Sequence, residues 1–285
     1  MQNPNLLPVL FLLASLGLAW GCAEEPTPPA GFPISTSSDS ARYYYYQGWQ
    51  EIMDYGQYSA SEASFRKAVS FDNSFTLGKS VLARVTTDLE ERLELYTELE
   101  EELPSFSGPE RAILDVYIGL VEYTNLREQN QTEAAGNRLY EVLDLAKINF
   151  GEVIRAFPEE IYIKCEYIEI LHAVEGPALA LDSINLLSTS EQMNNPFLLG
   201  YRSALLTELE DYEGAMEMAV QLERELDNAA LPKSHTVYAN LYFDMDSLAK
   251  AKQYADFAYF LDPNNLDASR LRDQIDAAIA SEAGF

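Results

Sequence analysis

Hydrophobic residues recur at intervals of three and four positions from Ala41 to the end of the chain, the spacing that places side chains on one face of an α-helix. The clearest stripe runs through Leu89, Leu93 and Leu99, with carboxylates on the remaining faces. Glycine and proline fall between these periodic segments, and the alternation typical of β-strands is almost absent. The pattern predicts an all-α protein.

The breaks in this pattern set the boundaries of the predicted helices. Pro158 and Pro263 each end a segment because proline lacks the backbone N–H, whereas Pro177 is placed to open one. Residues 126–135 are polar and are expected to form a loop. Helices are expected over residues 43–54, 58–71, 75–87, 88–103, 137–157, 161–173, 177–187 and 266–278, with a helix opening at residue 107 and two further pairs within 199–222 and 235–263.

Three segments share one arrangement of residues around the second helix of a pair. In the last segment, three alanines lie on one helix face, where small side chains let a neighbouring helix approach closely. In the first segment a serine, a phenylalanine and an alanine take these places, after a glycine and a tyrosine. The arrangement is carried by Gly56, Tyr58, Ser61, Phe65 and Ala68, by Tyr212 and Ala215, and by Ala251, Ala255 and Ala258.

This arrangement resembles the tetratricopeptide repeat (TPR), including its bacterial lipoprotein members. Ala215 and Ala251 are 36 residues apart, close to the family's period of about 34 residues. Gly48 lies within one position of the glycine that the family carries in the first helix of a repeat. The resemblance implies a right-handed α-solenoid of about five to six helix–turn–helix pairs, and the helix over 266–278 is expected to cap its C-terminal end with a polar outer side.

The N-terminus carries a separate signal. Residues Leu6–Leu18 are almost wholly apolar, and such a run is too short for a bilayer span, which needs about 20 residues. It is typical of a signal peptide, expected here over residues 1–21. The sequence Ala19-Trp-Gly-Cys22 resembles the lipobox of bacterial lipoproteins, which implies that Cys22 is acylated and becomes the mature N-terminus. A conventional secretory signal with an incidental Cys22 is the alternative.

Residues 22–40 are expected to form a lipidated cysteine and a flexible linker. Pro, Ser and Thr dominate residues 23–40, and such a composition cannot pack a core. The folded repeat domain is then expected over residues 41–285. Ala23 stands where the inner-membrane retention signal has an aspartate, so the resemblance implies an outer-membrane lipoprotein of the bacterial cell envelope, on its periplasmic or its surface-exposed face.

The charge balance limits the partners. The chain has 46 Asp and Glu against 19 Lys and Arg, a net charge of −27. Binding to a phosphate backbone needs clustered basic residues, so nucleic acid is not expected as a partner. The acidity fits either a basic partner or a surface kept hydrated in a salty medium.

No arrangement of residues in the sequence predicts catalysis. His172 and His235 lie in different predicted repeats with no carboxylate or cysteine at ligand spacing, and Cys165 lies among apolar residues, as expected of a buried thiol. The chain has no nucleophile elbow, P-loop or Cys-x-x-Cys motif. We therefore expect no enzyme activity, no cofactor and no metal site.

The TPR resemblance implies a groove lined by the first helix of each pair, which holds extended peptides or partner helices. The residues that match these positions are Tyr43, Tyr46, Gln50 and Met53 in the first pair, and Thr236, Asn240 and Phe243 in the last. Aromatic and amide side chains suit contact with a protein. The alternative for residues 43–46 is that they are only a packing face. Of the basic residues with which TPR proteins hold a C-terminal carboxylate, Lys233 is the one candidate near these positions.

Together these features predict an exported lipoprotein whose TPR solenoid acts as a non-catalytic protein-binding scaffold or adaptor in the cell envelope. Its partner is expected to be a protein or peptide, and its link to the membrane the lipid anchor. Two alternatives remain open: a component of outer-membrane protein assembly, and a lipoprotein that binds a solute or glycan in an aromatic-lined pocket.

Overall fold

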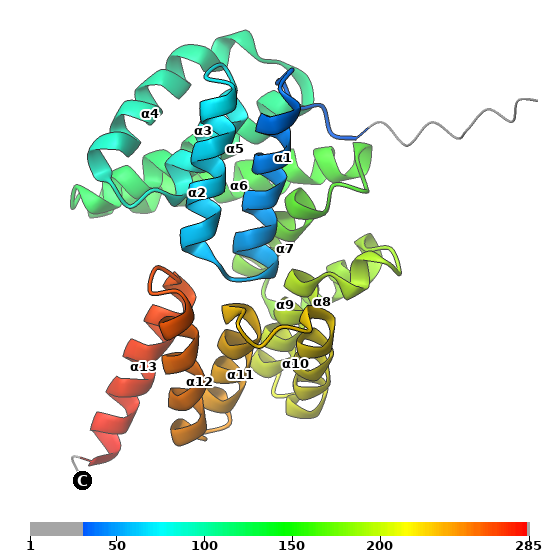
Figure 1. Ribbon diagram of the computed structural model, residues 1–285, viewed down its shortest axis with the longest axis vertical. Helices are drawn as coiled ribbons and strands as arrows, with labels where there is room; N and C mark the ends of the chain where they lie inside the picture. Colours follow the sequence, from blue (N-terminus) through cyan, green and yellow to red (C-terminus); the bar gives the residue numbers. More distant parts are fainter. Residues whose placement is uncertain (1–30, 284–285) are drawn as a thin grey trace, which may run out of the picture. The chain divides into compact units, whose positions relative to one another are not determined.

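The computed structural model describes residues 31–283, which form helices joined by turns (Figure 1). The α-helices are α1 (Asp39–Trp49), α2 (Tyr58–Phe71), α3 (Thr76–Val85), α4 (Leu89–Glu102), α5 (Gly108–Glu128), α6 (Thr132–Ala156), α7 (Ile161–Glu175), α8 (Pro177–Leu187), α9 (Pro196–Glu208), α10 (Tyr212–Leu226), α11 (Pro232–Asp244), α12 (Leu248–Leu261) and α13 (Leu266–Ala283). A π-helical turn, Gln50–Asp54, continues α1, and 3-10 turns lie at Leu103–Ser105 and Gln192–Asn194.

Successive helices pack against each other in six pairs, α1 with α2 through α11 with α12, and α13 follows the last pair (Figure 1). Among residues 31–283 there is no β-strand. The predicted all-helical array of about five to six helix pairs with a final helix is therefore confirmed, with six pairs present. None of the helices in this part of the chain is both long and apolar enough to span a bilayer.

The predicted loop over residues 126–135 is wrong. Helix α5 continues to Glu128 and α6 begins at Thr132, so the connection consists of residues 129–131, with Asn130 at a positive φ of 60°. The polar residues of this stretch lie on the exposed sides of two helix ends. Arg92 of α4 holds the end of α5 through Asn125 and Glu128.

The first pair is held together by close contact between its two helices. Gly48 of α1 lies against the ring of Phe65 of α2, where a Cβ on residue 48 would be 2.6 Å from the nearest ring carbon. Phe65 is fully buried, and the rings of Tyr45 and Trp49 enclose it with centroids 6.2 and 5.8 Å away. Ala68 completes this face of α2 without any exposure. These small and aromatic side chains fit together as the sequence pattern predicts.

Residues 31–38 precede α1 without regular structure, yet they pack on the folded domain. Phe32 and Ile34 are buried, and the Phe32 ring meets the Phe157 ring edge-on at 5.6 Å. Ser35 is hydrogen-bonded to Glu110, and the Thr36 hydroxyl donates to Asp72 at 2.5 Å. The prediction of a flexible linker up to residue 40 is therefore wrong for residues 31–40. The two apolar side chains among the polar residues explain the error, because they reach the core.

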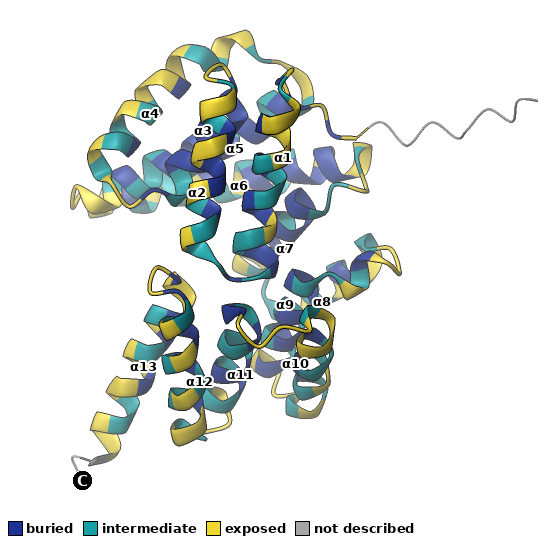
Figure 2. Ribbon diagram, in the orientation of Figure 1, coloured by how far each residue is buried: buried dark blue, intermediate teal, exposed yellow. Residues whose placement is uncertain are grey.

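Buried positions occur in helices throughout the described part of the chain (Figure 2). Among the buried apolar side chains, two separate clusters stand out. The larger cluster extends from Phe32 to Leu205 and so includes the interior of α1–α9. The smaller one joins α11, α12 and α13 through Ala239, Ala251, Ala255, Leu271 and Ile275. The two clusters share no residue, and this division matters for the site described next.

Candidate functional site

The turn between the two helices of the first pair lies against the last helices of the chain. The Lys233 amide at the start of α11 donates to the Tyr55 carbonyl at 3.1 Å, and the Asn265 side-chain amide donates to the Gly56 carbonyl at 2.8 Å. Gly56 has a φ of +69°, and a Cβ there would be 3.1 Å from the Lys233 backbone nitrogen. Glycine at this position therefore permits both the turn and the close approach of α11.

A cavity of about 280 Å³ opens beside this contact. Helices α9, α11 and α13 supply most of its lining, and the first pair supplies Ile52 and Gly56. Gly200 and Ala204 make the α9 side small, so space remains in front of that helix. This volume is near the lower end of the range of small-molecule pockets, about 300–1,000 Å³, and suits a group about the size of a side chain.

The polar lining of the cavity offers donors and acceptors from several helices. Thr236 and Asn240 come from α11, Asn265 precedes α13, and Gln274 comes from α13. Asn265 already caps α13 by accepting from the Ala268 amide at 2.8 Å. The other three side chains make no hydrogen bond to another side chain within residues 31–283. In the described part of the chain Asn240 and Gln274 are therefore available to a bound group, whereas the Thr236 hydroxyl donates to the Pro232 carbonyl at 3.2 Å and can offer only its acceptor.

Two basic side chains line the same cavity, Lys233 and Arg270. Within the described residues neither has a carboxylate within 4.0 Å, although most basic side chains elsewhere in this acidic chain do, such as Arg66 and Lys79. The Lys233 amino group lies 4.7 Å from the Phe197 ring centroid, a cation–π distance. One carboxylate, Asp267, is also in the lining, and it accepts from the Tyr58 hydroxyl at 2.9 Å.

A half-buried carboxyl on α7, Glu169, adds to the electrostatics of this region. Burial raises its pKa from 4.5 to about 7, the negative charge of Glu166 acts in the same direction, and the nearby Lys233 lowers it. Burial together with Asp267 likewise holds the pKa of Tyr58 well above its usual value, so this phenol stays protonated and acts as a donor. The region can therefore exchange a proton near neutral pH through Glu169.

Tyr201, the aromatic residue of the lining, is hydrogen-bonded on the side away from the cavity. Its hydroxyl lies 2.8 Å from Nδ1 of His172, and Nε2 of the same ring lies 3.0 Å from the Glu208 carboxylate. Burial raises the pKa of the Tyr201 phenol, and the charges of Glu169 and Glu208 raise it further. The phenol is thus a poor nucleophile, and this arrangement orients a hydrogen-bonding side chain at the cavity.

The residues predicted for the last pair divide between this cavity and the core. Thr236 and Asn240 both line the cavity, as a binding role requires. Phe243 instead packs against the smaller apolar cluster. Lys233, which the sequence offered as the one basic candidate for holding a C-terminal carboxylate, lies with the first two.

The residues predicted for the first pair lie elsewhere. Tyr43, Tyr46 and Gln50 line a separate open depression on the outer side of α1, which Tyr162 of α7 also borders. Tyr46 donates to Glu160 at 3.1 Å, and Met53 is buried in the larger cluster. The structure therefore does not bring the two predicted sets together into one groove.

The remaining sequence candidates can be placed briefly. Cys22 lies outside the described residues, and Cys165 is fully buried. His235 stacks with the Tyr254 ring and lies edge-on to Phe257. Among residues 31–283, no three His, Cys, Asp or Glu side chains are placed to hold a metal ion.

Sequence reasoning missed the side of the cavity formed by α9 and α13. Helix α13 was expected to turn its polar side outward, whereas Asp267, Arg270 and Gln274 line the cavity. A signal was available, because these residues follow each other at three and four positions and so share one helix face. Nothing in the sequence shows that this face meets Gly56, about 210 residues earlier in the chain.

No protein-family model matches the chain, and no curated protein matches it. Among solved structures, the chain is similar to a thermophilic TPR protein of Thermus thermophilus, with 16% sequence identity over 84% of this chain and 99% of that one, at a TM-score of 0.32. The assignment of a helical-repeat fold rests on the six helix pairs themselves.

Proposed function

We propose that this chain is a non-catalytic scaffold that binds a segment of a protein partner in the cavity between α9, α11, α13 and the turn of the first pair. The observation that carries the proposal is the presence there of two basic side chains without an ion-pair partner among the described residues, Lys233 and Arg270, beside the polar side chains of Thr236, Asn240 and Gln274. A helical-repeat fold suits such a role because its helices present side chains from several repeats to one ligand.

The charges of the cavity favour an acidic or polar group as the inserted part of the partner. Lys233 and Arg270 outnumber Asp267 in the lining, in a chain whose net charge is −27. Buried or half-buried cations gain most from a charged hydrogen-bond acceptor. The acidic remainder of the surface then selects against partners that are acidic throughout.

A photo-crosslinking amino acid at position 240 tests the proposal in intact envelopes. We expect it to capture one protein species, and the same group at Tyr140, a 74% exposed residue of α6, to give no such product. Replacing Lys233 and Arg270 together by alanine should abolish the product. Equal capture at both positions, or a product that is insensitive to the double replacement, contradicts the proposed site.

The location in the cell envelope is a second part of the proposal. The apolar run Leu6–Leu18 and the lipobox-like sequence ending at Cys22 support an exported, lipid-anchored protein of the outer membrane. Replacing Cys22 by alanine should move the protein from the membrane fraction to the soluble fraction, and replacing Cys165, which is buried, provides the matched control. Unchanged fractionation of the Cys22 variant would contradict the anchor.

The alternatives are separated by the same experiments. Capture of a β-barrel protein at position 240 would favour a role in outer-membrane protein assembly. The glycan-binding alternative calls for an aromatic-lined pocket, and of the residues that line this cavity in the described part of the chain only Tyr201 is aromatic. The structure therefore offers no specific support for that alternative.

A further inference from the structure

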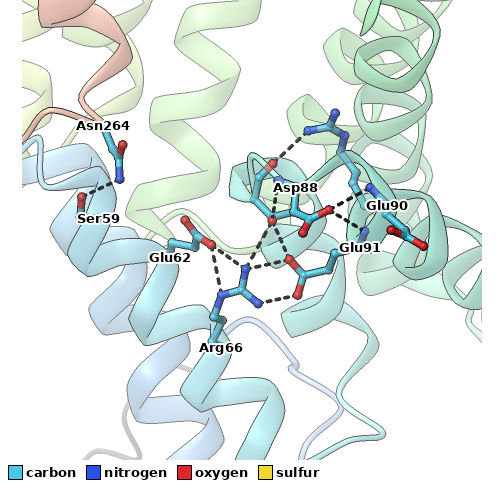
Figure 3. Close-up of polar contacts among 9 residues, drawn as sticks. Ser59, Glu62, Arg66, Asp88, Glu90, Glu91 and Asn264 are labelled. Carbon is cyan, nitrogen blue, oxygen red and sulfur yellow. Dashed lines mark hydrogen bonds and ion pairs between the residues drawn. The ribbon is translucent and has the colours of Figure 1, made fainter. Parts of the chain in front are cut away.

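Beyond the cavity, the first pair is bound to the end of the last pair through Ser59. The Ser59 amide donates to one oxygen of Asp262 at 2.9 Å, and its hydroxyl donates to the other at 2.6 Å. Asn264 donates to the same hydroxyl at 3.0 Å (Figure 3). We call these bonds, with those of Lys233 and Asn265 to the turn at 55–56, the closing contact.

The closing contact provides hydrogen-bond partners for backbone groups at helix ends that no nearby residue of the same segment satisfies. Gln57, which precedes α2, makes no capping hydrogen bond, so the Ser59 amide at the start of α2 depends on Asp262. In return, the Tyr55 carbonyl accepts from the Lys233 amide at the start of α11. Asp262 is 5% exposed, so its carboxylate is built into this contact.

Asp72, the equivalent residue of the first pair, shows that the bonds between Asp262 and Ser59 are specific to the closing contact and are not a feature of every repeat. Asp72 follows α2 as Asp262 follows α12. Its carboxylate accepts from Ser74 within its own turn and from Thr36 of the N-terminal segment. The same residue type at the same place thus stabilises two different neighbours, and Asp72 provides a control that lies outside the closing contact.

The closing contact is polar, whereas the helices on either side of it have separate apolar cores. The larger cluster ends at Leu205 of α9, and the smaller cluster lies within α11–α13. Helix α9 still packs on α11, so the two sides remain joined when the hydrogen bonds break. Opening the closing contact therefore exposes hydrogen-bonding groups, which water can satisfy, and leaves both apolar clusters intact.

We propose that the first pair, moving together with the rest of the larger cluster relative to α11–α13, is a movable wall of the cavity, held shut by Asp262 and Ser59, and that opening of the closing contact admits the partner's segment. This inference rests on the proposed function for the identity of the ligand, but not for the motion itself. Ile52 and Gly56 form the wall, and they lie within eight residues of Ser59. A ligand that contacts this wall and α11 together favours the shut form.

Thiol labelling measures the motion without any ligand. Ala204→Cys places a thiol in the cavity of the full chain, and a bulky maleimide reports on access to it, read on the peptide that carries residue 204. Ser59→Ala removes the charge-assisted hydrogen bond from the hydroxyl to Asp262 and should raise the labelling rate about tenfold. Asp262→Ala removes the acceptor of three hydrogen bonds, two from Ser59 and one from the Asn264 amide, and should raise the rate further. Asp72→Ala should leave the rate unchanged.

Hydrogen exchange in the same variants shows whether the opening is local. We expect faster exchange in residues 55–60 and 231–236 and unchanged exchange in α5. Labelling of the Ser59→Ala variant at the rate of the parent protein would overturn the movable wall, as would faster exchange in α5, which would show general loss of structure. Neither result touches the crosslinking at position 240, so failure of this inference and failure of the proposed function are distinguishable.

Discussion

Replacing Gly48 by alanine tests the packing of the first pair most directly. The new Cβ would lie 2.6, 2.7 and 2.9 Å from three carbons of the Phe65 ring, well inside van der Waals contact. The ring cannot move aside easily, because Phe65 is fully buried and the Tyr45 and Trp49 rings lie against it. The two helices must therefore separate, or Phe65 must leave its preferred conformation.

The expected magnitude follows from two opposing terms. Overpacking of a core costs about 1–3 kcal/mol, and replacing glycine by alanine inside a helix returns about 0.5–1 kcal/mol. We therefore expect Gly48→Ala to lower the free energy of unfolding by about 1–2 kcal/mol, because the clash outweighs the gain in helix propensity. For a chain of this size that corresponds to a fall in Tm of about 2–8 °C.

Urea unfolding followed by circular dichroism measures this loss, and Gly136 of α6 provides the matched control. A Cβ on Gly136 meets no atom within 4 Å, so Gly136→Ala should raise stability by about 0.5–1 kcal/mol. Combining Gly48→Ala with Phe65→Leu should restore part of the loss, since the smaller side chain vacates the space. If Gly48→Ala proved as stable as Gly136→Ala, the contact between residue 48 and the Phe65 ring would not constrain the pair.

Three further predictions concern buried titratable groups. Arg84→Ala should cost about 3 kcal/mol in urea unfolding because it leaves Glu166, whose side chain is 4% exposed, without the guanidinium 2.6 Å away; the corresponding change at the more exposed Arg66 should cost less than about 1 kcal/mol. Because the folded protein holds the Glu169 proton more tightly than the unfolded chain does, that residue removes stability as pH rises from 4.5 to about 7. Glu169→Gln should therefore gain stability over the parent protein across this window, with a constant difference above it, and a difference independent of pH would contradict the assigned pKa. Burial raises the pKa of the Cys165 thiol, so a thiol reagent should modify it no faster than the chain unfolds, as mass spectrometry of the native protein can show.

The helical part of the fold could be predicted because periodicity and helix-ending residues are local properties. The predicted turn at residues 55–57 and the first residues of α2 and α8 agree with the structure. The π-helical turn Gln50–Asp54 could not be predicted, because no residue type specifies it. A π-helical turn holds one more residue than an α-helical one, and this turn lies between Gly48 and the connection at residues 55–57.

The site could be predicted only in part, for a related reason. Thr236 and Asn240 were found because they belong to a helix whose repeat pattern is clear. The opposite side of the cavity depends on contacts such as that between Gly56 and Asn265, which are 209 residues apart. Each helix pair is rotated slightly relative to the one before it. Contacts between the first and last pairs depend on the total of these rotations over six pairs, which the local pattern of one sequence does not reveal. The packing of residues 31–38 escaped prediction because Phe32 and Ile34 stand among disorder-favouring neighbours.

The closing contact also has a consequence for how this protein can evolve. In an open array of repeats, a helix pair can be gained or lost with little penalty, because each pair contacts only its neighbours. Here Asp262 of the last pair must reach Ser59 of the first, so insertion or deletion of one pair would separate them. The closing contact between the two ends therefore constrains the number of repeats, whereas substitutions in the repeats between them can still change the cavity.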